Sequence, residues 1–92
     1  MAGVRLVLQF TAPNAAEAAQ AVEAMSERCR KAQQEPGCIQ FEVFRSALEP
    51  EKYALLEHWA SEEALEEHRK RGITPSNPNI KRVREHYEHK EA

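Results

Sequence analysis

The stretch EPGCIQFEVFR, residues 35–45, decides how this chain folds. Pro36 and Gly37 are typical of the residues that follow the end of a helix. The residues after them alternate between apolar and polar side chains, which predicts a strand. The side chains expected on one face of this strand are Ile39, Phe41 and Val43.

A second strand is predicted shortly after the first, at KYALLEHWA, residues 52–60. The connection at residues 46–51 is short and turn-like, so we expect the two strands to form an antiparallel hairpin. The side chains expected on one face of this second strand are Tyr53, Leu55, Glu57 and Trp59.

The residues before this hairpin predict one strand and one long helix. Residues 4–10 follow a period of two, which predicts a strand. Asn14 suits a helix N-cap, and Glu17 three residues later completes a capping box. Residues 15–34 are rich in good helix formers. We expect this helix to lie on a surface, because its apolar residues form a single stripe. The stripe consists of Ala18, Val22, Met25, Cys29 and Ala32.

The residues after the hairpin predict a second helix, a loop and one further element. Ser61 can cap the helix, and residues 73–79 are expected to form a loop because of their proline and asparagine content. Residues 80–89 fit both a strand and a helix. We favour a strand, because the preceding order leaves a place for a fourth one. The sum is an α+β, ferredoxin-like βαββαβ fold with an antiparallel sheet, expected as a single domain over residues 1–92.

One face of the predicted sheet has no helix to cover it. The right-handed crossover should place both helices on the same side, which leaves apolar side chains mixed with charged ones on the other. A two-fold homodimer is the most economical way to cover that face. The apolar residues expected there are Val7, Phe44, Leu56 and Cys38.

The composition excludes several classes of partner. A formal net charge of −2 provides no basic field for a phosphate backbone, so we expect no nucleic acid. No apolar stretch approaches the roughly 20 residues needed to span a bilayer, so we expect no membrane. The first five residues lack the long apolar segment typical of a secretory signal, so we expect none. We therefore expect a cytoplasmic protein in which Cys29 and Cys38 stay reduced.

His68 is the strongest candidate for a chemical role. It lies three residues after Leu65 and four after Ala64, so it should share their face of the second helix, which points at the sheet. Histidine can accept or donate a proton near neutral pH. The alternative is a structural histidine at a helix end, hydrogen-bonded to backbone or solvent.

Three residues of the second hairpin strand have both a functional and a structural interpretation. Trp59 and Tyr53 could form the wall of a pocket for a flat aromatic ligand, or they could fill the core. Glu57 shares their face, where a buried carboxylate must be paired or protonated. An ion pair with Arg5 or Arg45 is the simpler explanation, and an acid with a raised pKa is the alternative.

Neither a metal nor a cofactor is expected. His58, His86 and His89 do not converge as zinc ligands must. The chain has no glycine-rich phosphate loop, no paired Cys-x-x-Cys and no nucleophile elbow. The charged residues 66, 67 and 69–71 of the second helix are most simply a solvated surface.

Four stretches of this chain resemble the antibiotic biosynthesis monooxygenase family of dimeric α/β-barrel proteins. They are EPGC at 35–38, FEVFR at 41–45, EHW at 57–59 and SEEALEEH at 61–68, and the resemblance covers residues 4 to about 70. It implies a homodimer whose two sheets pack into a barrel, with one pocket per subunit between sheet and helices.

The same resemblance implies an activity. Members of the family include oxygenases that need neither metal nor flavin and act on polycyclic phenols or quinols, and relatives in the superfamily degrade haem. His68 matches the helix position where the family commonly has histidine. The haem-degrading relatives have an asparagine on the first strand, which is apolar here, and a haem-ligating histidine where Pro78 stands. These differences disfavour haem degradation.

Two functions stay open on these grounds. In a cofactor-independent monooxygenase, His68 would take the proton of a small aromatic phenol or quinol. The residues expected to contact its rings are Trp59, Tyr53, Phe41 and Leu65. The alternative is a non-catalytic ligand-binding or assembly protein on the same scaffold, because a fold does not fix a function. RNA binding would need a basic surface with stacking aromatics, which the acidic balance disfavours.

Overall fold

The chain alternates strands and helices in the order β-α-β-β-α-β. The structure is a computed structural model and describes residues 2–71 and 79–90. The last strand confirms the strand predicted at residues 80–89, whereas the loop predicted at 73–79 lies almost entirely outside the described residues. The elements are β1 (Ala2–Thr11), α1 (Ala15–Ala32), β2 (Cys38–Arg45), β3 (Lys52–Trp59), α2 (Glu62–Lys70) and β4 (Lys81–Lys90).

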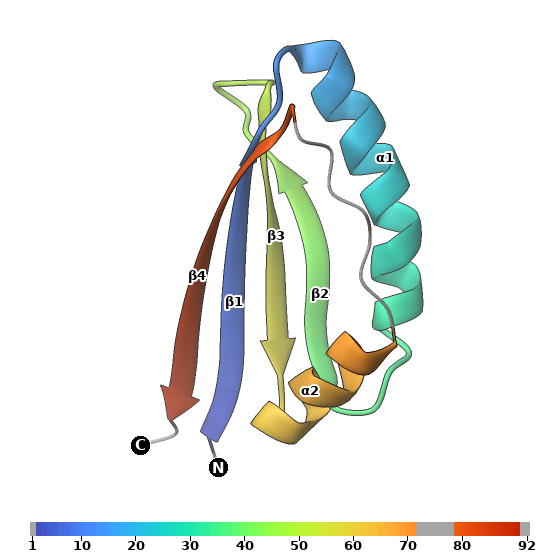
Figure 1. Cartoon of the computed structure of the whole chain (residues 1–92), viewed down its shortest axis with the longest axis vertical. Coiled ribbons are helices and arrows are strands. Elements are labelled where there is room, and N and C mark those ends of the chain that lie inside the picture. Colours follow the sequence, from blue (N-terminus) through green and yellow to red (C-terminus); the bar gives the residue numbers. More distant parts are fainter. Residues whose placement is uncertain (1, 72–78, 91–92) are drawn as a thin grey trace.

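The four strands form one antiparallel sheet in the order β2-β3-β1-β4. β1 lies inside the sheet and pairs with β3 on one side and with β4 on the other. Both helices cover the same face, with α1 running along the sheet and α2 lying near the end where β1 begins (Figure 1). This arrangement confirms the predicted ferredoxin-like fold.

The helices begin where the sequence predicts. The side chain of Asn14 accepts a hydrogen bond from the backbone N–H of Glu17 at 2.8 Å, and Ser61 caps α2 in the same way. The face of α1 that is fully buried consists of Ala18, Cys29 and Ala32, all from the predicted stripe. Neither described helix has the length and apolar content needed to cross a bilayer.

Gly37 is the point where the chain turns from α1 into β2. Its φ of 81° lies in the left-handed region that favours glycine. A methyl group added to Gly37 would lie only 2.6 Å from the Cβ atom of Ala64 on α2. The carbonyl of Gly37 also accepts a hydrogen bond from the N–H of Ala60 at 2.8 Å. Glycine at this position therefore allows the turn after α1 to pack directly against α2.

β2 contains a bulge that the sequence did not reveal. The register with β3 shifts between Cys38 and Gln40, so that Cys38 is opposite Trp59 and Phe41 is opposite Glu57. Cys38 consequently packs against the core, and Ile39 is 60% exposed. The prediction that Ile39 shares a face with Phe41 and Val43 is wrong, as is the prediction of Cys38 on the open face. The extra residue reverses the alternation on one side of the bulge.

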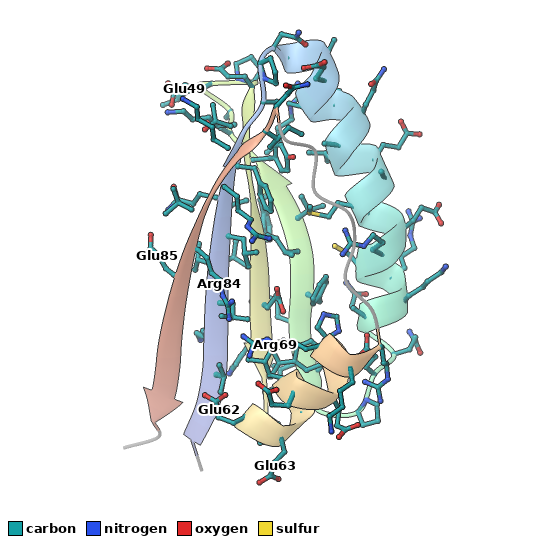
Figure 2. The ribbon with its side chains drawn as sticks, viewed as in Figure 1. Glu49, Glu62, Glu63, Arg69, Arg84 and Glu85 are labelled. Atoms are coloured by element: carbon teal, nitrogen blue, oxygen red, sulfur yellow. The ribbon has the colours of Figure 1, made fainter. Side chains whose placement is uncertain are left out.

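The face of the sheet without helices carries apolar side chains among polar ones. Leu56 is opposite Val7 in the β1–β3 register, and Phe44 on β2 is 46% exposed. Val83 on β4 is 61% exposed. The amide of Gln9 donates a hydrogen bond to Glu85, which projects away from the helices (Figure 2). We call this surface the open face.

Candidate functional site

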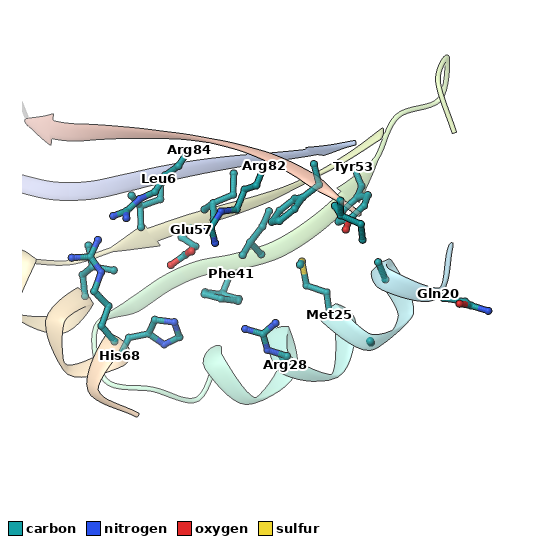
Figure 3. A pocket seen from close by; sticks show the side chains of 18 of the residues that line it. Leu6, Gln20, Met25, Arg28, Phe41, Tyr53, Glu57, His68, Arg82 and Arg84 are labelled. Atoms are coloured by element: carbon teal, nitrogen blue, oxygen red, sulfur yellow. The ribbon is translucent and has the colours of Figure 1, made fainter. Parts of the chain in front are cut away.

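A cavity of about 690 Å³ lies between the sheet and the two helices, and residues from all six elements or their flanks line it (Figure 3). This volume is within the range of pockets that hold small organic molecules. Most of the lining is apolar. The apolar lining includes Leu6, Leu8, Phe10, Phe41, Leu55 and Leu65.

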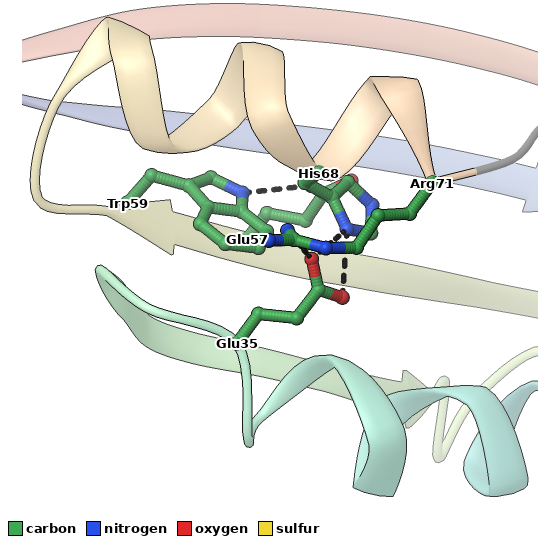
Figure 4. A network of polar contacts seen from close by, with 5 residues as sticks. All are labelled: Glu35, Glu57, Trp59, His68 and Arg71. Carbon is green, nitrogen blue, oxygen red and sulfur yellow. Dashed lines mark hydrogen bonds and ion pairs between the residues drawn. The ribbon is translucent and has the colours of Figure 1, made fainter.

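His68 lies at one end of this cavity and lines it. Its side chain is 23% exposed, and its Nδ1 atom lies 3.1 Å from both carboxylate oxygens of Glu35. The ring centroid lies 4.8 Å from that of Trp59 and 5.3 Å from that of Phe41. The imidazole thus lies between the Glu35 carboxylate and the Trp59 ring (Figure 4), and the Phe41 ring is also close to it.

Glu35 is the partner of His68 that sequence reasoning missed. It comes from the turn after α1, is only 16% exposed in its side chain, and accepts a further hydrogen bond from Arg71 at 2.7 Å. When Nδ1 carries the proton and donates it to Glu35, the other ring nitrogen is an acceptor. The only sequence signal was an acidic residue just before Pro36 and Gly37, and nothing local connects it to a histidine 33 positions later.

Trp59 lies behind the cavity wall rather than on it. The side chain is fully buried, is absent from the cavity lining, and packs against the His68 ring. Its indole N–H donates a hydrogen bond to Glu57 at 3.0 Å. In this position Trp59 can support His68, whereas Phe41 and Leu65 are placed to touch a ligand directly.

Glu57 is buried, with 7% exposure, and lines the cavity. Its partner is Trp59, so the predicted ion pair with Arg5 or Arg45 is wrong. Arg45 instead donates to the backbone oxygens of Ala15 and Pro50. Arg5 cannot reach Glu57, because it is exposed and its position in β1 faces the other side of the sheet.

Tyr53 lies at the opposite end of the cavity from His68 (Figure 3). Its ring stacks on Phe10 with 4.8 Å between centroids and an angle of 5° between planes. Burial raises the pKa of the Tyr53 hydroxyl, which keeps it protonated. Nearby, Oε2 of Glu17 is buried and has no hydrogen-bond partner among the described residues. That oxygen could accept a hydrogen bond from a hydroxyl group of a ligand.

Four arginines also line the cavity: Arg28, Arg69, Arg82 and Arg84. The sequence predicted that Arg69 belongs to a solvated surface, and its guanidinium does pair with Glu66 at 2.7 Å. Arg69 nevertheless lines the cavity together with Arg84 from β4. Sequence reasoning missed the arginines of β4, because the face they occupy depends on how β4 pairs with β1.

The thiols and histidines offer no second chemistry in the described part of the chain. No group of three His, Cys, Asp or Glu side chains there could hold a metal ion. Both cysteines are free. Burial raises the pKa of the Cys29 thiol, and burial followed by the Glu35 charge raises that of Cys38. Neither thiol is therefore activated as a nucleophile.

Solved structures with the same fold come from several organisms. A conserved protein of unknown function from Bacteroides thetaiotaomicron, suggested to be an oxidoreductase, aligns with a TM-score of 0.79 and 21% identity over 95% of this chain and 97% of its own. A candidate antibiotic biosynthesis monooxygenase from Deinococcus radiodurans gives 0.79 and 22%, over 97% and 94%. A mutant of SnoaB, a cofactor-independent oxygenase from Streptomyces nogalater, gives 0.67 and 15%, over 92% and 90%. At these identities the likeness concerns the fold.

Sequence comparison identifies the family. No curated protein matches the chain significantly. The family described as antibiotic biosynthesis monooxygenase matches residues 3–85, which extends the resemblance seen at residues 4–70 into β4. Because this match spans most of the 92 residues, the chain belongs to the antibiotic biosynthesis monooxygenase family.

Proposed function

We propose that the protein is a cofactor-independent monooxygenase that oxidises a small phenol or quinol in the cavity between sheet and helices. The observation that carries this proposal is the contact between Glu35 and His68 at the end of an apolar cavity. A carboxylate that binds one ring nitrogen orients the imidazole and leaves the other nitrogen as a proton acceptor. Membership of the family supports the same class of reaction.

The reaction would begin with proton transfer from the substrate hydroxyl to His68. The phenolate then passes one electron to O₂, and the two radicals combine at a ring carbon. His68 returns its proton to the peroxide, which loses water and leaves a carbonyl group. One oxygen atom of O₂ stays in the product and the other leaves as water, whose hydrogens both come from the substrate. The substrate supplies all the electrons, and the protein supplies one base.

The cavity walls would place the substrate and exclude water. Phe41 packs against His68, and Leu65 lies one helical turn before it on α2. Both line the cavity and would contact the rings, and Tyr53 would close the far end (Figure 3). Trp59 would act from behind, by holding the His68 ring. Apolar surroundings strengthen the electrostatic contact between Glu35 and His68 and protect the reactive anion from bulk water.

The open face supports a second part of the proposal, a homodimer. Exposed Ile39, Phe44 and Val83 are apolar surface that a second copy could bury. Each subunit would then bind a small aromatic molecule in its cavity and a second copy of this chain on its open face. Two-fold pairing through one such surface is the common solution in small proteins.

The non-catalytic alternative predicted that Leu65, Trp59 and Phe41 would fill the space between helix and sheet. The cavity of about 690 Å³ argues against that version. Binding without turnover remains the competing outcome of the experiment below.

Oxygen consumption with anthrone, whose enol tautomer is a polycyclic phenol, tests the proposal. With a chelator present, we expect uptake above the uncatalysed rate and incorporation of one ¹⁸O atom from ¹⁸O₂ into anthraquinone. His68→Asn should lower kcat about a hundredfold or more, the usual contribution of a general base. Glu67→Gln on the exposed side of α2 is the control and should behave like the wild type.

Two results would contradict the proposal. Equal rates for the wild type and His68→Asn would remove His68 from the mechanism. Saturable binding of phenols without any enzyme-dependent oxygen uptake would favour the binding protein.

A further inference from the structure

The cavity lining has the opposite charge from the chain. The whole chain has a formal net charge of −2, yet among the described residues four arginines and only two glutamates, Glu17 and Glu57, line the cavity. The arginines come from three separate elements: α1 supplies Arg28, α2 supplies Arg69, and β4 supplies the other two. A cationic excess gathered from three elements around one cavity favours an anion inside it.

The cationic excess is clearest on β4, because two of its arginines face the helices. Arg82 is opposite Phe10 and Arg84 is opposite Leu8 in the register with β1. They therefore project to the same side as the apolar cavity floor (Figure 3). Val83 between them is 61% exposed on the open face. A strand that only covered a core would carry its apolar residue on the helix side instead.

Three of these guanidinium groups have no carboxylate partner among the described side chains. Among the side chains that the structure describes, no ion pair is made by Arg28, Arg82 or Arg84, whereas Arg30 pairs with Glu27 on the outer side of α1. Guanidinium groups bind carboxylates and similar oxyanions through paired, charge-assisted hydrogen bonds. The unpaired arginines are thus available to a ligand, and they lie beside apolar surface that could hold its rings.

We infer that this cavity takes an amphipathic aromatic anion: a flat apolar ring system that carries a carboxylate or sulfonate group. The inference rests on the proposed function for the ligand's reacting hydroxyl, which would lie at His68. The rings would cover Leu6, Leu8 and Phe41, and the acidic group would lie against Arg82 and Arg84. The arginines would thereby select among phenols and fix the orientation of the one that reacts.

Two fluorescent probes of nearly the same shape test the inference. 1-Anilinonaphthalene-8-sulfonate carries one negative charge, and N-phenyl-1-naphthylamine is its neutral counterpart. We expect the double variant Arg82→Gln/Arg84→Gln to weaken binding of the sulfonate probe about tenfold or more, as for loss of a charge-assisted hydrogen bond. The dissociation constant of the neutral probe should change less than about twofold, because that probe has no anionic group for the arginines to bind.

A matched control separates local contacts from overall charge. Arg30→Gln/Lys31→Gln changes the net charge by the same amount as the β4 variant, but on the exposed side of α1. It should leave binding of both probes unchanged. If the double variant fails to fold by circular dichroism, the single variants Arg82→Gln and Arg84→Gln test the same contact. In the wild type, added salt should weaken binding of the sulfonate probe but not binding of the neutral probe. The inference would be overturned if the β4 variants bound both probes equally more weakly. It would also be overturned if the α1 control lost as much affinity for the sulfonate probe as the β4 variants.

Turnover distinguishes this inference from the proposed function. We expect a higher kcat/KM for anthrone with a ring carboxylate than for anthrone, and loss of the difference in Arg82→Gln/Arg84→Gln. If neither compound is oxidised but the sulfonate preference holds, the proposed function fails and the inference stands. If both are oxidised equally well and charge has no effect on binding, the inference fails and the proposed function stands.

Discussion

Glu35, in the turn after α1, contacts His68 in α2 and Arg71 at the end of that helix. It contacts His68 through both carboxylate oxygens and accepts a hydrogen bond from Arg71. With 16% exposure of its side chain, this carboxylate is screened less by solvent than the exposed pairs on the helix surfaces. At the scale of single residues, Glu35 is therefore the side chain that sets the orientation of the His68 ring.

Replacing Glu35 by glutamine tests this positioning role. The amide keeps the size but removes the charge, and it can present its NH₂ group instead of an acceptor to Nδ1. We expect kcat for anthrone to fall about tenfold to a hundredfold, as for other carboxylates that orient a functional histidine, with little change in KM. Steady-state oxygen uptake measures both quantities.

The control for this variant is Glu27→Gln, which removes an exposed carboxylate paired with Arg30 on α1 and should leave kcat unchanged. Glu35→Asp should recover part of the activity. A rise in KM with an unchanged kcat would show that Glu35 acts in substrate binding instead.

At the scale of elements, α2 is placed by its contact with the turn before β2. Gly37 has a φ of 81°, and Ala64 lies where a Cβ atom at position 37 would clash. The hydrogen bond from Ala60 to Gly37 holds the beginning of α2 against the same turn. His68 and Glu35 can meet only because these two segments approach so closely.

Gly37→Ala should destabilise the fold by about 1–3 kcal/mol, the cost of forcing a residue with a Cβ into an unfavourable φ, with the clash against Ala64 added. Urea unfolding followed by circular dichroism gives the free energy. Gly37→Ala/Ala64→Gly removes the clash but keeps the φ, so it should recover part of the loss. Gly37→Ala with wild-type stability would show that α2 can move away at no cost.

At the scale of the whole molecule, the two faces of the sheet have different roles. The helix side holds the cavity, and the open face exposes Phe44 and Val83. A chain of 92 residues buries only about 60–65% of its unfolded surface, so its own core is marginal. Association through the open face would add to that core without closing the cavity.

Phe44→Glu tests the proposed homodimer. In sedimentation equilibrium we expect the wild type at twice the mass of the 10.5 kDa chain, and the variant shifted toward the monomer because a buried carboxylate without a partner opposes association. Leu48→Glu is the control: Leu48 is 93% exposed in the turn after β2, so this variant should remain dimeric. A monomeric wild type, or equal effects of the two variants, would contradict a dimer through the open face.

Local signals were enough to predict most of the fold. Asn14 and Ser61 cap the helices as expected, because a cap depends on residues within one turn. β4 was ambiguous by periodicity, and pairing along the whole of β1 makes it a strand. The bulge after Cys38 could not be predicted from alternation, because one inserted residue changes the face without changing the composition.

The sequence by itself determined the order of the elements, the inward side of α2 that carries His68, and the buried side of β3 that carries Glu57. Only the tertiary structure decided which side chains meet. Glu35 reaches His68, Glu57 binds Trp59, and Arg82 turns into the cavity. The reason is that periodicity and capping depend on near neighbours in the chain, whereas these meetings depend on strand register and on how closely the segments pack.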